Sequence, residues 1–318
     1  MSQTTHAVIG AGISGLLLAR NLQAAGAKVV VLEKSRGYGG RLATKRVGEA
    51  VFDQGAQFFT ARDPEFVTQA LAWRAAGLVG DWPGPAIGRM MGRPAMTAVP
   101  KALAEGLDIR REHKVTAASR LADSSWELAI ENQAPVRAGR LLLTSPVPQS
   151  LALLAAGGVN LPAPVHDSLC RLTYHPCLAL LVVLSGPSAV PPEGITFSTG
   201  PVRWMADNVR KGITQNVPAA VTIHAAPEFS AENYGRTEAE VAALLLPAVA
   251  PWLGAPVVST TLHRWKFSEP KATHPERCVW LPELGLGFAG DAFGGPRVEG
   301  AALSGLALAA LLSRGSAP

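Results

Sequence analysis

The stretch HAVIGAGISGLLLARNLQAAGAKVVVLEK, residues 6–34, decides the fold. A short β-like run at 6–9 leads into GAGISG at 10–15, a helical pattern over 13–25 and the β-branched run KVVVL at 28–32. A strand, a glycine turn, a helix and a second strand within about 30 residues form a βαβ unit. The glycine spacing is that of GxGxxG, which permits a tight turn and close approach of a pyrophosphate to the backbone.

An acidic residue completes this motif. Gly10, Gly12, Ser14 and Gly15 stand at the start of the helix, where free N–H groups and the positive end of the helix dipole favour phosphate. Glu33 lies 18 residues after Gly15, at the end of the second strand, where a carboxylate accepts hydrogen bonds from ribose hydroxyls. The pattern predicts a dinucleotide-binding unit and leaves NAD and FAD open.

A second glycine-rich segment, EKSRGYGGRLATKR at residues 33–46, follows directly. On its own, its run of basic residues is typical of a solvated loop. Gly39 and Gly40 would allow another close backbone approach, and Arg41 could neutralise a diphosphate through bidentate hydrogen bonds. In flavoprotein oxidases of the amine oxidase and phytoene desaturase type, GGR occupies this place, and that similarity favours FAD.

Together with DQGAQFFTARDPEF at residues 53–66, this segment resembles the renalase family. The likeness covers residues 1–65, recurs at the C-terminus and is thin between them. Renalases are FAD enzymes that oxidise off-pathway dihydro isomers of NAD(P) and pass the electrons to oxygen. The resemblance therefore implies a small dinucleotide substrate and hydrogen peroxide as product. We also assign Lys34, Gln57, Phe58 and Val115 to the FAD site.

The C-terminal stretch GFAGDAFGGPRVEGAALSG, residues 287–305, has the pattern of strand, glycine turn and helix. We expect Asp291 to bind a ribityl hydroxyl, although it could simply cap a turn. The helix from Val298 would point its N-terminal amides at the flavin pyrimidine, where negative charge accumulates on reduction. Arg297 would hold this turn or a substrate phosphate, with a surface ion pair to Glu299 as the alternative. Monoamine oxidases attach flavin to a cysteine in a related region; this stretch has none, so we expect non-covalent FAD.

Three residues of the middle segment are candidates for the substrate pocket. Asn208, His224 and Trp265 resemble renalase positions in their DN, IH and RW contexts. The resemblance implies that Trp265 packs near a nicotinamide while Asn208 and His224 orient its carboxamide or ribose. From the residues alone, each also has a purely structural interpretation, as a turn former, a structural histidine and a core aromatic. Hydride transfer from a dihydropyridine needs no general base, so positioning is the task of the protein.

The order of patterns predicts an α/β fold. A Rossmann-type FAD-binding domain would be assembled from residues 1–60, 94–150 and 276–318. Residues 61–93 and 151–275 would form a second, mainly antiparallel β substrate domain, because alternating segments separated by proline-rich turns begin near residue 151.

Composition limits the remaining classes. The apolar fraction of 48% and charged fraction of 17% are those of a globular protein. The longest mostly apolar stretch, 241–258, contains three prolines and follows a capping box of Thr237 and Glu240, so we expect no membrane span. The start has no basic region typical of a signal peptide, and the three cysteines form no CxxC pair. We therefore expect a cytoplasmic protein without a structural metal site. The net charge of +5 does not indicate nucleic-acid binding, because the basic residues are not interleaved with aromatics as in nucleic-acid platforms. A small anionic ligand explains this charge as well.

Three other functions stay open. One is a flavin amine oxidase or desaturase acting on another small apolar substrate, although the chain is short for such enzymes and shows no obvious lysine and aromatic-cage signature. A second is a flavin-binding interaction protein without turnover. A third is an NAD-dependent dehydrogenase. The sequence leaves the oligomeric state and the preference between NAD and NADP undetermined.

Overall fold

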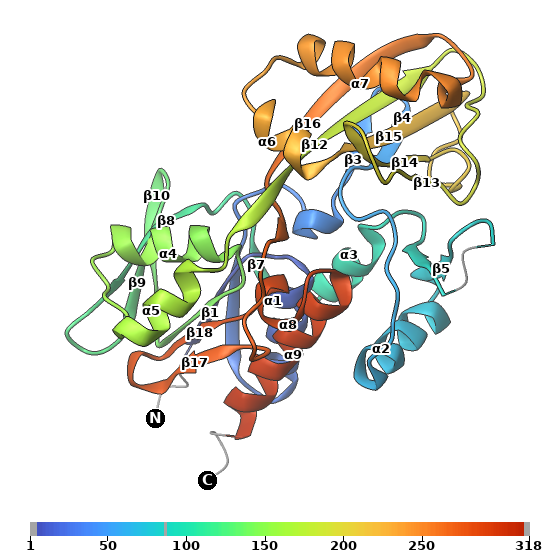
Figure 1. The fold of residues 1–318 in the computed structure, drawn as a ribbon. Helices are drawn as coiled ribbons and strands as arrows, with labels where there is room; N and C mark the ends of the chain where they lie inside the picture. Colours follow the sequence, from blue (N-terminus) through green and yellow to red (C-terminus); the bar gives the residue numbers. More distant parts are fainter. Residues whose placement is uncertain (1–4, 86–87, 315–318) are drawn as a thin grey trace.

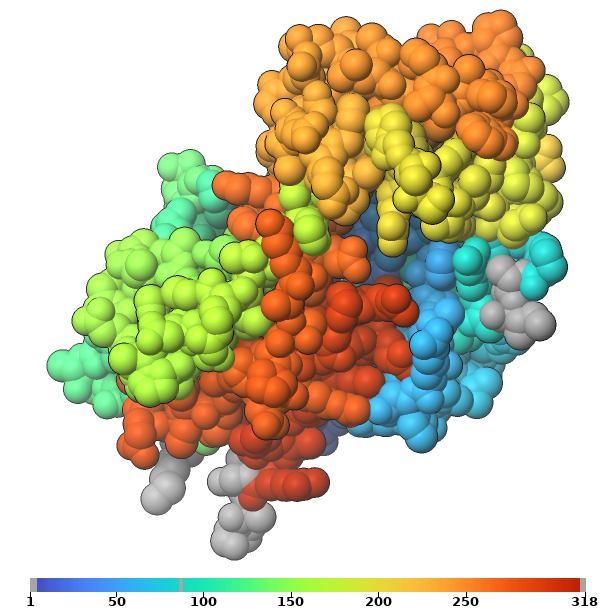
Figure 2. Space-filling model, viewed as in Figure 1, coloured from blue at the N-terminus to red at the C-terminus, as the bar shows by residue number. Residues whose placement is uncertain are grey.

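The chain folds into two parts, the upper of which overhangs the lower in the space-filling view (Figures 1 and 2). The structure, a computed structural model, describes residues 5–85 and 88–314. Residues 1–4, 86–87 and 315–318, which fall within the domain ranges expected from the sequence, lie outside the described residues. A mainly parallel sheet forms the centre of the lower part and an antiparallel sheet that of the upper part, which confirms the predicted fold class.

The lower sheet contains the predicted βαβ unit. Its strands in spatial order are β17 (Val279–Leu281), β18 (Leu286–Phe288), β11 (Arg140–Leu143), β1 (Thr5–Ile9), β2 (Lys28–Leu32) and β7 (Asp108–Arg110). All neighbours run parallel except β17 and β18. Such a sheet is buried on both faces. Val8 accordingly packs in one apolar cluster with α1 (Ile13–Ala24) and α9 (Val298–Arg314), whereas Ala7 and Ile9 pack in another.

Smaller elements cover the second face of this sheet. They are the strands of a three-stranded antiparallel sheet, β8 (Val115–Arg120), β9 (Trp126–Ile130) and β10 (Gln133–Ala138), with the helices α4 (Val147–Ala156) and α5 (Ala163–Cys170). Their buried side chains share one cluster with the sheet, which includes Trp126 and Leu128.

The upper part is a five-stranded antiparallel sheet. Its strands in spatial order are β13 (Ile195–Thr196), β14 (Val202–Asp207), β15 (Ala219–Ala225), β12 (Tyr174–Leu184) and β16 (Val257–Pro270). One face packs against α7 (Glu238–Leu253), which begins with the predicted capping box, and α6 (Pro227–Glu232) lies beside it. The opposite face is turned toward the lower part and carries the residues described below.

Residues 44–104 join the two parts. They form the hairpin β3 (Thr44–Val47) and β4 (Ala50–Asp53), then α2 (Pro64–Ala75), β5 (Val79–Asp81), β6 (Met90–Gly92) and α3 (Ala98–Ala104). Phe52 of β4 packs on the upper sheet with Leu181, whereas Phe66 of α2 shares the cluster of α1. The β3–β4 hairpin thus packs against the upper sheet, and α2 packs against the Rossmann unit. The domain boundaries themselves stay a prediction.

Candidate active site

The first glycine turn leaves room where a phosphate is expected. Gly10 has a φ of +106°, which turns the chain from β1 into α1. A side-chain carbon on Gly15 would lie 2.1 Å from the Gly10 carbonyl oxygen, so α1 can approach β1 only because this residue is glycine. A carbon on Gly12 would meet nothing within 4 Å. The buried Oγ of Ser14 has no hydrogen-bond partner among the described residues. Open space and an unsatisfied hydroxyl at a helix N-terminus fit the pyrophosphate of a dinucleotide.

The second glycine segment packs against the first. The Gly39 N–H donates to the Ala11 carbonyl at 2.8 Å. The carboxylate of Glu33 is buried and accepts from the N–H groups of Ala11 and Ser35, each at 2.8 Å. A carboxylate has about four lone-pair positions, so these two donors leave capacity for a ribose hydroxyl. Glu33 thus both braces the turn and remains suited to its predicted partner.

Arg41 and Asp291 form one ion pair, although the sequence suggested separate roles for them. The guanidinium donates to the two carboxylate oxygens at 2.5 and 2.7 Å, and to the Ser268 carbonyl at 3.0 Å. The hydroxyl of Tyr174 donates to the same carboxylate at 3.4 Å. Burial opposes the charge of Arg41, but Asp291 outweighs it and raises the pKa of the guanidinium. The fork expected to neutralise a diphosphate is therefore directed at Asp291, and the pair joins the second glycine segment to β16 and the C-terminal turn.

The C-terminal turn is tightly packed. Asp291 begins α8 (Asp291–Gly294), and a side-chain carbon on Gly294 would lie 2.0 Å from the Gly300 carbonyl oxygen. Arg297 is exposed, and Val298 begins α9 as predicted. The alternative ion pair of Arg297 with Glu299 is not formed, because Glu299 accepts from the backbone N–H groups of Arg62 and Asp63 at 2.6 and 2.8 Å.

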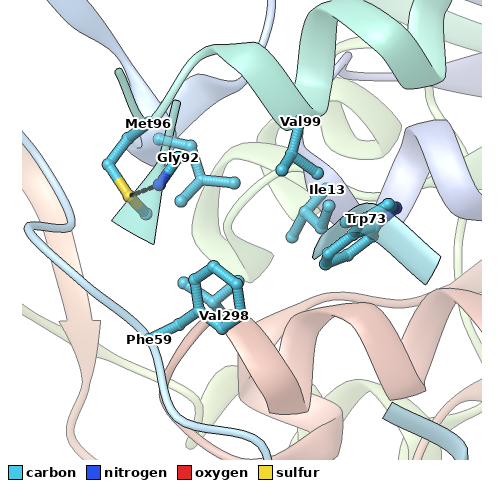
Figure 3. Close-up of a pocket in the computed structure, with 8 residues that line it drawn as sticks. Ile13, Phe59, Trp73, Gly92, Met96, Val99 and Val298 are labelled. Atoms are coloured by element: carbon cyan, nitrogen blue, oxygen red, sulfur yellow. Dashed lines mark hydrogen bonds between the residues drawn. The ribbon is translucent and has the colours of Figure 1, made fainter. Parts of the chain in front are cut away.

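An apolar pocket lies between α1, α3 and the start of α9 (Figure 3). It is too narrow to admit water, and its interior contact is the Gly92 N–H, which donates to the Met96 sulfur at 3.2 Å. The lining residues are Ile13, Leu42, Phe59, Trp73, Gly92, Met96, Val99 and Val298. The residues that line this pocket therefore belong to the apolar core beneath the glycine turn. They offer no polar group to a ligand.

The lower face of the upper sheet carries a row of candidate side chains. Trp204, His224, Ala179 and His263 stand opposite one another on β14, β15, β12 and β16. Because side chains alternate along a strand, Trp265 lies on the same face as His263, and the two rings are 4.3 Å apart. The small side chain of Ala179 separates the two histidines.

The Gln54 carbonyl fixes the state of His224. It accepts from Trp265 Nε1 at 3.0 Å and lies 3.1 Å from His224 Nε2. A carbonyl can only accept, so His224 carries its proton on Nε2 and presents Nδ1 as an acceptor. Burial lowers the pKa of His224 to about 4, despite the opposing effect of the carbonyl. His263 is also shifted by burial, which lowers its pKa to about 4. Both rings are neutral at pH 7.

Asn208 follows β14 on the same face as Trp204, but its side chain has no group left for a ligand. It is fully buried; its Oδ1 accepts from the Asp53 N–H at 3.2 Å, and its Nδ2 donates to the Ala220 carbonyl and to Thr222 Oγ1 at 2.8 and 2.9 Å. These bonds occupy both amide hydrogens and the oxygen. The structure thus brings His224 and Trp265 together, and it uses Asn208 to tie β4 to the upper sheet.

Sequence reasoning missed Lys211. Its side chain is fully buried, and its Nζ lies 2.8 Å from Asp53 Oδ2 and 3.1 Å from Gln57 Oε1. Burial lowers the pKa of Lys211, against the opposing effect of Asp53. The Gln57 amide also donates to the Asp53 and Gly55 carbonyls, so its side chain is occupied within the protein. No local signal in DNVRKG distinguishes this lysine from a surface lysine.

The other predicted FAD residues occupy different surroundings. Phe58 packs edge-on against Trp82 and Trp204. Val115 is buried in the same cluster as Leu32 at the end of β2. Lys34 is exposed, and its Nζ lies 3.4 Å from Gln149 Oε1.

Two glycine segments on a Rossmann unit, faced by an antiparallel sheet, define a two-part dinucleotide-binding flavoprotein. The family models agree: residues 8–72 match an NAD(P)-binding Rossmann-like domain, and residues 82–313 match the flavin containing amine oxidoreductases. The chain belongs to the flavin containing amine oxidoreductase family. It is an FAD-dependent oxidoreductase.

Solved structures show the same fold. A proposed protoporphyrinogen oxidase from Exiguobacterium sp. 255-15 is 13% identical with a TM-score of 0.79, covering 99% of this chain and 100% of that one. Putrescine oxidase bound to putrescine is 16% identical with a TM-score of 0.71, covering 98% and 99%. Cyclohexylamine oxidase from Brevibacterium oxydans IH-35A is 14% identical with a TM-score of 0.69, again covering 98% and 99%. Within residues 5–85 and 88–314, no helix has the length and apolar character needed to cross a membrane.

Proposed function

We propose that this protein is an oxidase of dihydro isomers of NAD(P), with oxygen as electron acceptor and hydrogen peroxide and NAD(P)⁺ as products. The observation that carries the proposal is the character of the sheet face above the Rossmann unit. His224 offers a neutral acceptor there, Trp265 offers a ring face, and both are held by one carbonyl. A dihydronicotinamide has a planar ring and a carboxamide N–H donor that match these two groups.

The charges near this face favour a dinucleotide over an amine. Lys211 acts on His224 as a positive charge that disfavours its protonation. Asp53 is already paired with Lys211, and Arg89 lies over Trp204 in the same row. An amine substrate is a cation at neutral pH, and its approach to such surroundings costs free energy. The amine oxidase alternative is therefore less well supported, although the family as a whole includes it.

The residues of this chain position the substrate and do not move its protons. The structure fits FAD at the open Gly12 and unsatisfied Ser14 beside Glu33. Bound FAD would supply the acceptor for a hydride and the route of the electrons to oxygen. His224 Nδ1 would accept from the carboxamide or a ribose hydroxyl, and Trp265 would pack on the nicotinamide. Asn208 would act indirectly, by holding the segment that contains Gln54. Renalase-type activity needs no further acid or base.

Anaerobic mixing tests the proposal. The purified protein is combined with NADH, with 2- and 6-dihydro isomers of NAD, and with putrescine or cyclohexylamine, while the visible absorbance of the flavin is recorded. We expect rapid bleaching by the isomers and slow or no bleaching by NADH and the amines. Bleaching by an amine alone would instead support the amine oxidase alternative. Tight flavin that none of these compounds reduces would support an interaction protein.

The low pKa of His224 predicts a flat pH profile. Its value of about 4 lies below the ordinary 6.5, so the neutral acceptor persists above about pH 4 and is lost below it. We expect kcat/KM for a dihydro isomer to show no step near pH 6.5 between pH 5.5 and 8.5. The unfolded chain takes up the proton near 6.5, so the stability due to this histidine falls as pH drops from 6.5 toward 4. A step near 6.5 that disappears in His224→Leu, but not in His263→Leu, would contradict the assigned state.

A further inference from the structure

An aromatic cluster with one arginine lies at the end of the His224 row. Phe58, Trp82 and Trp204 have ring centroids 5.4 to 6.0 Å apart. The guanidinium carbon of Arg89 lies 4.3 Å from the Phe58 ring centroid and 5.4 Å from that of Trp204. We call these four residues the Arg89 cluster. It joins the β5–β6 hairpin to β14, at the right of Figure 1.

The Arg89 cluster has donors without matching acceptors. Arg89 forms no ion pair with any residue in the part of the chain that the structure describes. Its hydrogen bond goes to the Glu193 backbone carbonyl at 3.3 Å. The indole nitrogens of Trp82 and Trp204 are buried and also lack a partner among the described residues. Trp82 is 3% exposed and Trp204 8%. Buried donors are normally satisfied, so this cluster is suited to a ligand rich in acceptors.

The separation between Arg89 and His224 indicates which acceptor group of a ligand would reach Arg89. Trp204 stands directly opposite His224 on the neighbouring strand, and adjacent strands are about 4.8 Å apart. The guanidinium carbon of Arg89 lies 5.4 Å from the centroid of the Trp204 ring. Arg89 and His224 are thus separated by one strand spacing and one aromatic contact, a separation on the order of 10 Å at most between the guanidinium and the His224 strand. In a nucleotide, the 5′-phosphate lies beyond the base by the length of one ribose, and the separation in the protein is of this size.

We propose that Arg89 binds the 5′-phosphate of the nicotinamide nucleotide half of the substrate. This inference rests on the proposed function and adds a specificity-determining residue to it. Arginine suits the task because its planar fork matches phosphate oxygens and its face stacks on aromatic rings. Phe58 and Trp204 hold the guanidinium in place before the substrate arrives. Phe58 therefore serves the substrate phosphate in this proposal, where the sequence suggested FAD.

A matched pair of substrates isolates the phosphate. The 6-dihydro isomers of nicotinamide mononucleotide and of nicotinamide riboside differ only in that group. We expect the wild-type holoenzyme to have a KM roughly 10 to 100 times lower for the mononucleotide, as expected for a charged hydrogen bond. Arg89→Met should raise the KM for the mononucleotide by that factor, leave kcat within about twofold and leave the riboside unchanged. Arg89→Lys should recover part of the difference.

The control variant is Arg93→Met, on the same hairpin. Arg93 donates to the Lys211 and Asp81 carbonyls and does not lie over the aromatic cluster. We expect it to change the two substrates equally. Equal effects of Arg89→Met on the two substrates, or a wild-type enzyme that does not distinguish them, would overturn the phosphate site while leaving the proposed function intact.

A binding measurement separates this proposal from the proposed function and does not depend on turnover. Ribose 5-phosphate and ribose are titrated into the wild-type holoenzyme and into Arg89→Lys and Arg89→Met, with tryptophan fluorescence as the readout. We expect saturable binding of ribose 5-phosphate alone to the wild type, weaker binding to Arg89→Lys and none to Arg89→Met. If neither dihydro compound reduces the flavin but this pattern holds, the proposed function fails and the phosphate site stands. If the wild type does not bind ribose 5-phosphate, the site is refuted even where Arg89→Met fails to fold.

Discussion

Replacing Lys211 with methionine is expected to lower the free energy of unfolding by about 3–5 kcal/mol, the usual cost of removing one partner from a buried ion pair. Lys211 and Asp53 both have fully buried side chains, and their charged atoms are 2.8 Å apart. Without the ammonium, Asp53 keeps Thr44 and the Met96 N–H as partners and loses its counter-charge. Urea unfolding of the apoprotein at pH 7, followed by tryptophan fluorescence, measures the change.

Two further variants test the cause. Asp53→Asn in the Lys211→Met background removes the stranded charge and should recover at least about 1 kcal/mol of the loss. Lys101→Met, on the exposed side of α3, should change stability by less than about 0.5 kcal/mol. A loss below about 1 kcal/mol for Lys211→Met would show that the pair is not a buried charge pair. Because Asp53 precedes Gln54, the destabilised variant should also bind a dihydro isomer more weakly.

Gly12→Ala is expected to weaken FAD binding roughly 10- to 100-fold without changing the stability of the apoprotein, because overpacking costs about 1–3 kcal/mol only when the cofactor is present. A side-chain carbon at Gly12 would meet nothing beyond its own chain neighbours within 4 Å, and the backbone there is extended with a φ of −77°. The new methyl group would therefore occupy space intended for the pyrophosphate. Flavin fluorescence on titration with the apoprotein gives the affinity, and thermal unfolding gives the stability.

Gly15→Ala is the matched control, because its new methyl group would collide with the protein itself and not with the cofactor. Its side-chain carbon would lie 2.1 Å from the Gly10 carbonyl and 2.7 Å from Thr144 Oγ1, so α1 must move away from β1. We expect this variant to lose about 1–3 kcal/mol of apoprotein stability as well as FAD. Equal losses of apoprotein stability in the two variants would show that Gly12 has a structural role. Unchanged FAD affinity in Gly12→Ala would place the cofactor elsewhere.

The βαβ unit could be predicted because its signals are local. The helix predicted over 13–25 is observed at Ile13–Ala24, and the strand KVVVL at Lys28–Leu32. The helix α4 has an ambiguous start signal, because Pro146 and Pro148 are typical of the end of a strand and proline is also favoured in the first turn of a helix. The strand β10 contains Pro135, which weakens any strand pattern.

The site was only partly predictable because its decisive contacts are distant in sequence. Glu33 and the glycines are recognised by spacing within one unit. The pair of Arg41 with Asp291 spans 250 residues, and nothing local shows that the two side chains meet. Sequence context does not separate Asn208 from His224. In the structure, hydrogen bonds within the protein use the whole amide of Asn208, whereas His224 keeps Nδ1 as an acceptor for a ligand. Burial of Lys211 depends on Asp53, 158 residues away.

The position of α9 has a consequence for biosynthesis. Gly305 of α9 packs so closely on α1 that a side-chain carbon there would lie 2.2 Å from the Ser14 carbonyl oxygen. During translation, α1 emerges from the ribosome long before α9, the helix that covers it. The upper sheet, from β12 to β16, is continuous in the chain and comes out of the ribosome before α9. The N-terminal unit with α1 is thus partly uncovered until α9 has been synthesised. A chaperone or early flavin capture would protect it during that interval.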